Sequence, residues 1–421
     1  MFKKIVFKNG LRIITIPVKN TKTATFLVLV GTGSKYETKE TSGISHFLEH
    51  MFFKGTKNRP STLDIAETLD KIGGEYNAFT SKEITGFWAK VASQHQDIAL
   101  DWISDILLNP KLESEEIEKE KGVIMEEMNM HLDTPVAYVG DLWERLLYKD
   151  QPAGWDIIGR KESVMELGKE KVADYLKRHY SCQNTVICAA GNINPETIEE
   201  KIRKYFKNIN KIAPEQKIKV KERQESPESL IHFKKTDQTH LCLGVRAYDI
   251  FNPKRYALGL LATILGGNMS SRLFIKIRER RGLAYYIRTV AEGATDTGWL
   301  TTQAGVDHKN AEKVIGLILE EYRSFKDKLI TKEELKKAKD YTKGSMSLQL
   351  EPSDAQTFFY AEQELLKKEI LKPEQIFKKI DEVSANDIKK VAQDIFRPEK
   401  LNLALIGPFK EKEKFTKLLK I

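Results

Sequence analysis

The stretch T-V-I-C-A-A-G at residues 185–191 and the stretch L-N-L-A-L-I-G at residues 401–407 each follow a segment with apolar residues at helical spacing. The two stretches are 216 positions apart, from 185 to 401, and residues 166–191 pair with residues 382–407 without a gap. A second pair, S-E-E-I-E-K-E-K from Ser114 and K-E-E-L-K-K-A-K from Lys332, is 218 positions apart. Two nearly equal offsets of about half the chain predict a duplication that gives two similar domains.

The N-terminal part of the chain has the composition of β-strands. Residues 4–7 and 11–16 flank Asn9-Gly10 and predict a β-hairpin, and the apolar run at 24–30 predicts another strand. Further along the first half of the chain, a segment with apolar residues at helical spacing predicts a helix, and Pro110 marks the end of this helix. Strands followed by helices within each repeat predict an α+β fold, with two homologous domains that each have a largely antiparallel sheet and helices packed on one face.

The position of the domain boundary follows from local composition. The segment around Ala213-Pro214 is charged and contains a proline, which is typical of a connection between domains. We therefore expect one domain at 1–210, a linker at 211–229 and a second domain at 230–421.

Bulk composition excludes several classes of protein. With 421 residues of which 41% are apolar, the chain is globular and long enough for two domains. Cys182, Cys188 and Cys242 are too few and too scattered for a disulfide framework and are expected to be buried thiols. The sequence has no signal-peptide run and no membrane-spanning stretch, which predicts a cytoplasmic protein without a membrane partner. The net charge of +9 comes from basic residues interleaved with acidic ones, a pattern that disfavours nucleic-acid binding.

The motif H-F-L-E-H at residues 46–50 has the chemistry of a metal site. On a helix, His46 and His50 lie one turn apart on one face, so both imidazoles can reach one metal ion. Glu49 lies next to that position and stays free to act as a base. A zinc ion held in this way lowers the pKa of its bound water to about 7, which suits peptide hydrolysis at neutral pH.

A catalytic zinc site needs a third protein ligand, and the helix expected at 114–129 offers Glu120, Glu126 and Glu127. Glu120 and Glu127 are two turns apart and share a face, so one can bind zinc while the other orients a histidine. In the second copy, the offset of 218 places Ala338 and Ser345 at these positions, and that copy has no H-x-x-E-H motif. The second copy thus lacks both the histidines and the two carboxylates. This favours the interpretation that all of them belong to one metal site, over the alternative that the two carboxylates are ordinary solvated charges.

The stretch G-I-S-H-F-L-E-H-M-F-F-K-G-T at 43–56 resembles the pitrilysin-like, or inverzincin, zinc peptidases, which include the insulin-degrading enzymes and the β subunit of the mitochondrial processing peptidase. Residues 73–81, 120–127 and 271–285 also look like signatures of this family, and the length resembles its short bacterial members. The resemblance implies one Zn²⁺ per chain on His46, His50 and Glu127. It also implies that Glu120 supports the site and that Glu49 is the general base.

The same resemblance implies where substrate binds. Asn77, Ala78 and Phe79 match an edge strand that accepts an extended peptide as an added β-strand, although Asn77 could instead be a turn residue after Gly73-Gly74. Arg278 and Tyr285 look like a pair that binds a substrate carbonyl and stabilises the oxyanion, the alternatives being a surface arginine and a packed tyrosine.

Short family members pair two subunits, so Arg278 and Tyr285 are expected to act on the zinc site of a partner subunit. A homodimer is expected, and a heterodimer with a non-catalytic homologue stays open. The resulting prediction is a zinc endopeptidase that acts on peptides or unfolded polypeptides. The alternative is a non-catalytic subunit, which the complete set of metal-site residues disfavours.

Overall fold

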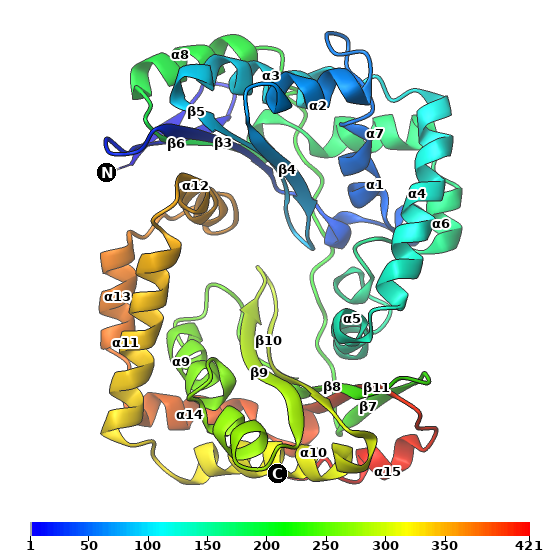
Figure 1. The fold of residues 1–421 in the computed structure, drawn as a ribbon, viewed down its shortest axis with the longest axis vertical. Helices are drawn as coiled ribbons and strands as arrows, with labels where there is room; N and C mark the ends of the chain where they lie inside the picture. Colours follow the sequence, from blue (N-terminus) through cyan, green and yellow to red (C-terminus); the bar gives the residue numbers. More distant parts are fainter. Residues whose placement is uncertain (1) are drawn as a thin grey trace. The chain divides into compact units, whose positions relative to one another are not determined.

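The computed structural model describes residues 2–421, and its internal contacts divide them into two compact units (Figure 1). Unit 1 contains the residues up to Met128 together with Trp155–Ile218 and Leu348–Ile370. Unit 2 contains Asn129–Gly154, Lys219–Ser347 and Leu371–Ile421. Each unit therefore includes a segment from the other half of the chain, which the expected continuous domains of 1–210 and 230–421 do not include.

Unit 1 is built on a six-stranded sheet in the order β1-β2-β6-β3-β5-β4. The pairs are antiparallel apart from β2 and β6, which are parallel. The predicted hairpin is present as β1 and β2, and Gly10 in its turn has a φ of +92°, which favours glycine. The strands are β1 (Lys3–Val6), β2 (Arg12–Pro17), β3 (Thr23–Val30), β4 (Glu75–Thr80), β5 (Thr85–Ala92) and β6 (Thr185–Gly191).

Helices cover both faces of this sheet because its central strands are apolar on both sides. Phe26 and Val28 of β3 pack in the main core of unit 1, whereas Leu27 and Leu29 pack on the opposite face. Seven helices contribute to the main core: α1 (Ile44–Met51), α2 (Thr62–Asp70), α3 (Gln96–Leu108), α4 (Ser114–Leu132), α6 (Lys161–Met165), α7 (Lys169–His179) and α8 (Pro195–Tyr205).

The opposite face of the unit 1 sheet is covered by a helix from the second half of the chain. This helix is α12 (Ser353–Glu362), which continues into a π-helical turn at Gln363–Lys367. Ala361 and Leu365 pack on the apolar sheet face, and the Ser353 hydroxyl lies 2.8 Å from that of Thr25. The predicted helices on one face are thus present, and α12 adds a second layer.

Unit 2 repeats this design with a five-stranded sheet in the order β7-β11-β8-β10-β9. Only β7 and β11 are parallel. Its main core involves α9 (Arg255–Gly266), α10 (Ala311–Asp327), α11 (Lys332–Gln349), α13 (Pro373–Asp381), α14 (Ala385–Ile395) and α15 (Lys412–Thr416), while α5 (Pro135–Tyr148) packs on the other face. The strands are β7 (Glu228–Phe233), β8 (Thr239–Arg246), β9 (Ala284–Gly293), β10 (Gly298–Val306) and β11 (Leu401–Gly407).

The repeat predicted from the sequence corresponds to equivalent elements in the two units. β6 and β11 begin 216 positions apart, as do α7 and α14, and α4 and α11 begin 218 positions apart. The strand order of unit 2 matches that of unit 1 without β1. The predicted α+β fold with two similar, largely antiparallel sheets is confirmed. All three cysteines are buried and free, as expected, and within residues 2–421 no helix combines the length and apolar character needed to span a bilayer.

Candidate metal centre

The helix α1 carries the H-x-x-E-H motif on the side that faces away from the core. Phe47, Leu48 and Met51 are buried in the core of unit 1, which fixes the rotation of the helix. His46, Glu49 and His50 are left on the opposite, partly exposed side. The rings of His46 and His50 are 4.6 Å apart between their centroids, as expected for residues separated by one turn.

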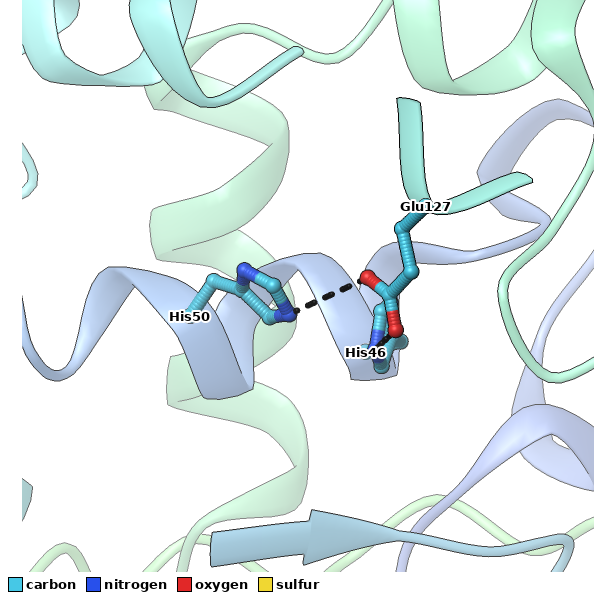
Figure 2. A group of neighbouring side chains, drawn as sticks. All are labelled: His46, His50 and Glu127. Carbon is cyan, nitrogen blue, oxygen red and sulfur yellow. Dashed lines mark ion pairs between the residues drawn. The ribbon is translucent and has the colours of Figure 1, made fainter. Parts of the chain in front are cut away.

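Glu127 on α4 completes a group of three side chains with the two histidines. Figure 2 shows the three side chains pointing toward one another from α1 and α4. The Nε2 atom of His46 lies 3.6 Å from Oε1 of Glu127, and the Nε2 atom of His50 lies 3.6 Å from the other oxygen, Oε2. One ligand atom from each residue lies within 4.8 Å of the other two, and no other such group of His, Cys, Asp or Glu occurs within residues 2–421. Of the three candidate carboxylates, Glu126 is exposed and lies outside this group.

The spacing of these atoms fits a zinc ion. Ligand atoms about 2.1 Å from a tetrahedral zinc are about 3.4 Å apart from one another. The separations of 3.6 Å between the imidazole nitrogens and Glu127 are close to that value and too long for good hydrogen bonds. Burial, together with the neighbouring His50, lowers the pKa of His46 to about 4. His46 is therefore neutral at pH 7, as a metal ligand has to be.

Glu120 lies behind His50 and fixes the orientation of its ring. The Nδ1 atom of His50 lies 2.8 Å from a Glu120 oxygen, and the other oxygen of this buried carboxylate lies 2.5 Å from Nζ of Lys54. With Nδ1 donating to Glu120, Nε2 keeps its lone pair toward Glu127. Burial alone would raise the pKa of Glu120, yet the hydrogen bonds with His50 and Lys54 hold it below its ordinary value. Burial opposes the charged form of His50, but the hydrogen bond to Glu120 and the nearby carboxylates raise its pKa.

Glu49 is held beside the two histidines by a residue that the sequence reasoning missed. Its Oε2 atom accepts a hydrogen bond of 2.6 Å from the hydroxyl of Thr80, the last residue of β4. Burial raises the pKa of Glu49, and the bond from Thr80 only partly opposes this effect. Lys54 was missed as well, because it lies in the turn after α1 ends at Met51, where helical spacing no longer indicates which residues share a side.

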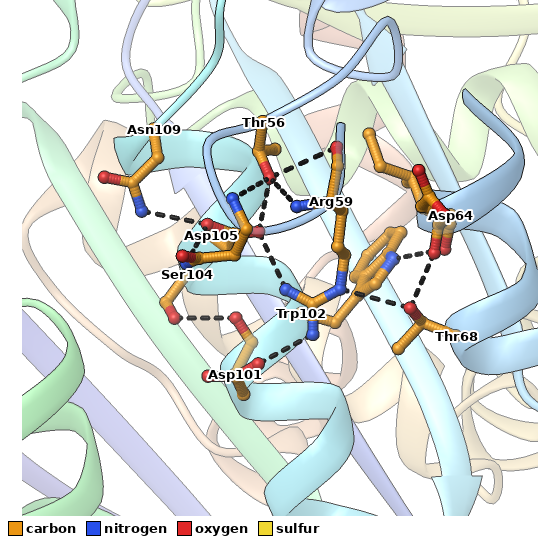
Figure 3. A network of polar contacts seen from close by, with 11 residues as sticks. Thr56, Arg59, Asp64, Thr68, Asp101, Trp102, Ser104, Asp105 and Asn109 are labelled. Carbon is orange, nitrogen blue, oxygen red and sulfur yellow. Dashed lines mark hydrogen bonds and ion pairs between the residues drawn. The ribbon is translucent and has the colours of Figure 1, made fainter. Parts of the chain in front are cut away.

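A polar network holds the segment that follows α1, which contains Lys54. Figure 3 shows Arg59 reaching between Asp101 and Asp105 of α3, and both ion pairs measure 2.7 Å. Asp105 is buried and also accepts a hydrogen bond of 2.6 Å from Thr56. Because Thr56 follows Lys54 by two residues, this network fixes the chain beside the partner of Glu120.

Comparisons with known proteins identify the family to which this chain belongs. Residues 12–161 match the family described as Insulinase (Peptidase family M16), and residues 166–341 match the description Peptidase M16 inactive domain. An uncharacterized zinc protease of Bacillus subtilis is 35% identical over 408 residues, which cover 97% of this chain and 98% of that protein. The chain belongs to peptidase family M16. The resemblance to pitrilysin-like peptidases inferred from the sequence is thus confirmed.

Other known proteins match along nearly the whole chain. An uncharacterized zinc protease of Streptomyces coelicolor is 31% identical over 424 residues, covering 98% of this chain and 90% of that protein. The crystal structure of a protease from Helicobacter pylori matches with a TM-score of 0.89 at 22% identity and covers 97% of this chain and 99% of that one. A Pseudomonas fluorescens structure titled as a peptidase M16 inactive domain has a TM-score of 0.88 at 16% identity, covering 98% and 99%. These two structures support the fold.

The residues expected to contact substrate in this M16 chain lie in different units. Asn77, Ala78 and Phe79 belong to β4, one of the two edge strands of the unit 1 sheet, so Asn77 is a strand residue and not part of the turn after Gly73-Gly74. Arg278 and Tyr285 belong to unit 2. Arg278 lies in a π-helical segment with its guanidinium 4.9 Å from the Phe274 ring centroid, and Tyr285 on β9 is 63% exposed. Their approach to a zinc site remains a prediction.

Proposed function

We propose that this member of family M16 is a zinc-dependent endopeptidase that hydrolyses peptides or unfolded polypeptides. The convergence of His46, His50 and Glu127, with the carboxylate of Glu49 beside them and outside this group, carries the proposal. The relatives named zinc proteases support it. When bound by these three side chains, one Zn²⁺ per chain would polarise the scissile carbonyl and activate water.

In this proposal, some residues of the site bind the zinc ion and others transfer protons. His46 and His50 would hold the ion through Nε2, and Glu120 holds His50 in the tautomer that leaves Nε2 free. Glu49 takes a proton from the attacking water on its carboxylate and passes it to the leaving amine. The raised pKa of Glu49, caused mainly by burial, suits a group that has to accept a proton and then release it. Thr80 keeps this carboxylate in place through its hydrogen bond.

Substrate is proposed to bind as an extended strand along β4. Asn77, Ala78 and Phe79 lie on that strand, whose one strand partner within the described sheet is β5. Backbone hydrogen bonds at a sheet edge hold a peptide largely independently of its side chains, and they require an extended backbone, which unfolded polypeptides can supply. Arg278 would bind a substrate carbonyl and Tyr285 would stabilise the oxyanion, acting from a partner subunit in a homodimer. A cytoplasmic location belongs to the same proposal.

The variant Glu49→Gln tests the proposal. We expect it to bind zinc as tightly as the parent protein and to lose nearly all hydrolysis of a mixed peptide library read by mass spectrometry. Glu126→Gln is the matched control, because Glu126 is exposed on α4 next to Glu127. His46→Ala should instead lose the metal. Full hydrolysis by Glu49→Gln, or hydrolysis by the parent protein that persists after chelation, would refute the assignment. A non-catalytic subunit would show no cleavage with zinc bound.

A further inference from the structure

The helix that carries both histidines has no N-terminal cap of its own. α1 has eight residues and begins after Gly43, which has no side chain to accept hydrogen bonds from the first turn. A helix this short is not stable by itself, so its ends depend on tertiary partners. Gly43 itself has a φ of +94°, and a Cβ there would lie 2.7 Å from the carbonyl oxygen of Ile158. A capping side chain at position 43 is therefore excluded by both conformation and space.

A carboxylate six residues earlier supplies the missing cap. Glu37 accepts a hydrogen bond of 2.7 Å from the backbone N–H of Gly43 on Oε2 and one of 2.9 Å from the backbone N–H of Ser45 on Oε1. Its side chain is buried, with 2% of the residue exposed. Both oxygens are thus used at the N-terminus of α1, where the helix dipole favours a negative charge.

A second contact holds the same turn from α7. The hydroxyl of Tyr175 lies 2.8 Å from that of Ser45 and 2.7 Å from that of Thr32, which follows β3. All three side chains are buried. Ser45 is therefore fixed through its backbone by Glu37 and through its side chain by Tyr175. The next residue in the chain is His46.

We propose that Glu37 is a positioning residue for the metal centre, which fixes the first turn of α1 and so directs His46 toward Glu127. The inference rests on the proposed function and goes beyond it, since Glu37 touches none of the three ligand residues. A buried carboxylate that only stabilised the fold would affect all of unit 1. A positioning carboxylate affects the first turn of α1 and the binding of zinc through His46.

Two measurements on the full chain separate these roles. Hydrogen exchange of the metal-free protein at pH 8 reports on the backbone of residues 43–48 without needing zinc. Competition against a chromophoric chelator gives the zinc dissociation constant without needing hydrolysis. The variants are Glu37→Ala, which removes both acceptors, and Glu37→Gln, which keeps the volume and one acceptor. Glu40→Ala is the matched control, because Glu40 is an exposed glutamate three residues away.

We expect faster exchange confined to residues 43–48 in both Glu37 variants and a zinc dissociation constant raised by about tenfold in Glu37→Ala, the lower end of what partners behind metal ligands contribute. Glu37→Gln should raise it less, and Glu40→Ala should change neither quantity. Tyr175→Phe should also raise the dissociation constant, because Ser45 loses its hydroxyl partner. If Glu37→Ala does not fold, Glu37→Gln and Tyr175→Phe decide the question.

If the folded Glu37 variants show unchanged hydrogen exchange at residues 43–48, the inference is wrong. It is also wrong if hydrogen exchange becomes faster over the whole of unit 1 while the zinc dissociation constant stays unchanged. A parent protein that does not bind zinc would refute the proposed function, and the exchange experiment would still show whether Glu37 holds the turn.

Discussion

Glu120→Gln should weaken zinc binding while leaving the chemistry of the bound enzyme intact. The Gln side chain can still accept the hydrogen bond from His50 Nδ1, but it loses the negative charge that now faces both His50 at 2.8 Å and Lys54 at 2.5 Å. Hydrogen bonds that involve a charged group contribute about 1.5–3 kcal/mol. Partners behind a metal ligand contribute about 10- to 100-fold in affinity, equivalent to about 1.4–2.8 kcal/mol. The two estimates agree, so we expect a loss of zinc affinity of about 10- to 100-fold.

The assay is a competition titration with a chelator, followed by peptide hydrolysis at saturating zinc. The dissociation constant should rise, whereas kcat at saturating zinc should stay within a few-fold, because Glu49 and the three ligands are unchanged. Glu115→Gln is the control: its ion pair with Lys119 on the same helix is at the surface, where such pairs contribute little. Wild-type affinity in Glu120→Gln would contradict the proposed role of Glu120. Loss of hydrolysis at saturating zinc would show that Glu120 takes part in the reaction.

Three further predictions follow from the same geometry. Chelation should abolish hydrolysis and added zinc should restore it, whereas cleavage that is insensitive to chelators would point to another mechanism. Burial raises the pKa of Glu37 to about 7, from about 4.5 in an unfolded chain. Its protonated form therefore contributes stability that is complete below pH 4.5 and is lost as the pH rises through 7. The unfolding free energy of the wild type relative to Glu37→Gln should fall by about 2–3 kcal/mol between pH 5 and pH 8 in denaturant titrations, and a pH-independent difference would refute this. A fragment of residues 1–218 should aggregate or unfold, since the sheet face covered by Leu348–Ile370 would be exposed, and solubility should improve when that segment is supplied as a peptide.

Local patterns were sufficient to predict most of the fold and to place His46 and His50 beside two candidate carboxylates, Glu120 and Glu127. The family resemblance then favoured Glu127 as the third residue of the metal cluster. The offset of 216 located β6 and β11, and helical spacing placed His46 and His50 on one face. The spacing of two turns between Glu120 and Glu127 put both on the side of α4 that faces α1.

The remaining features depend on tertiary contacts that no local pattern specifies. An amphipathic helix shows that it packs, but not on which sheet, so the exchange of α5 and α12 between the halves was not foreseen. Thr25 and Ser353, which meet at 2.8 Å, are 328 positions apart in the chain. The partners of Glu49 and Glu120 were missed for the same reason, since Thr80 and Lys54 are ordinary residues until the fold brings them to a carboxylate.

The duplication gives an internal control for the metal centre. Glu120 on α4 and Ala338 on α11 occupy equivalent positions, 218 residues apart, and each is 3% exposed. The same place in the same fold is therefore filled by a small apolar residue in unit 2 and by a carboxylate in unit 1. A buried carboxylate costs several kcal/mol of desolvation unless it is paired, and the fold does not require one at this position. In unit 1 the oxygens of Glu120 face His50 and Lys54. Unit 2 has no H-x-x-E-H motif and therefore no histidine that a carboxylate at this position could orient. Because the fold accepts alanine here, the stability of α4 does not require a charge at position 120, which fits the proposed role of Glu120 behind His50.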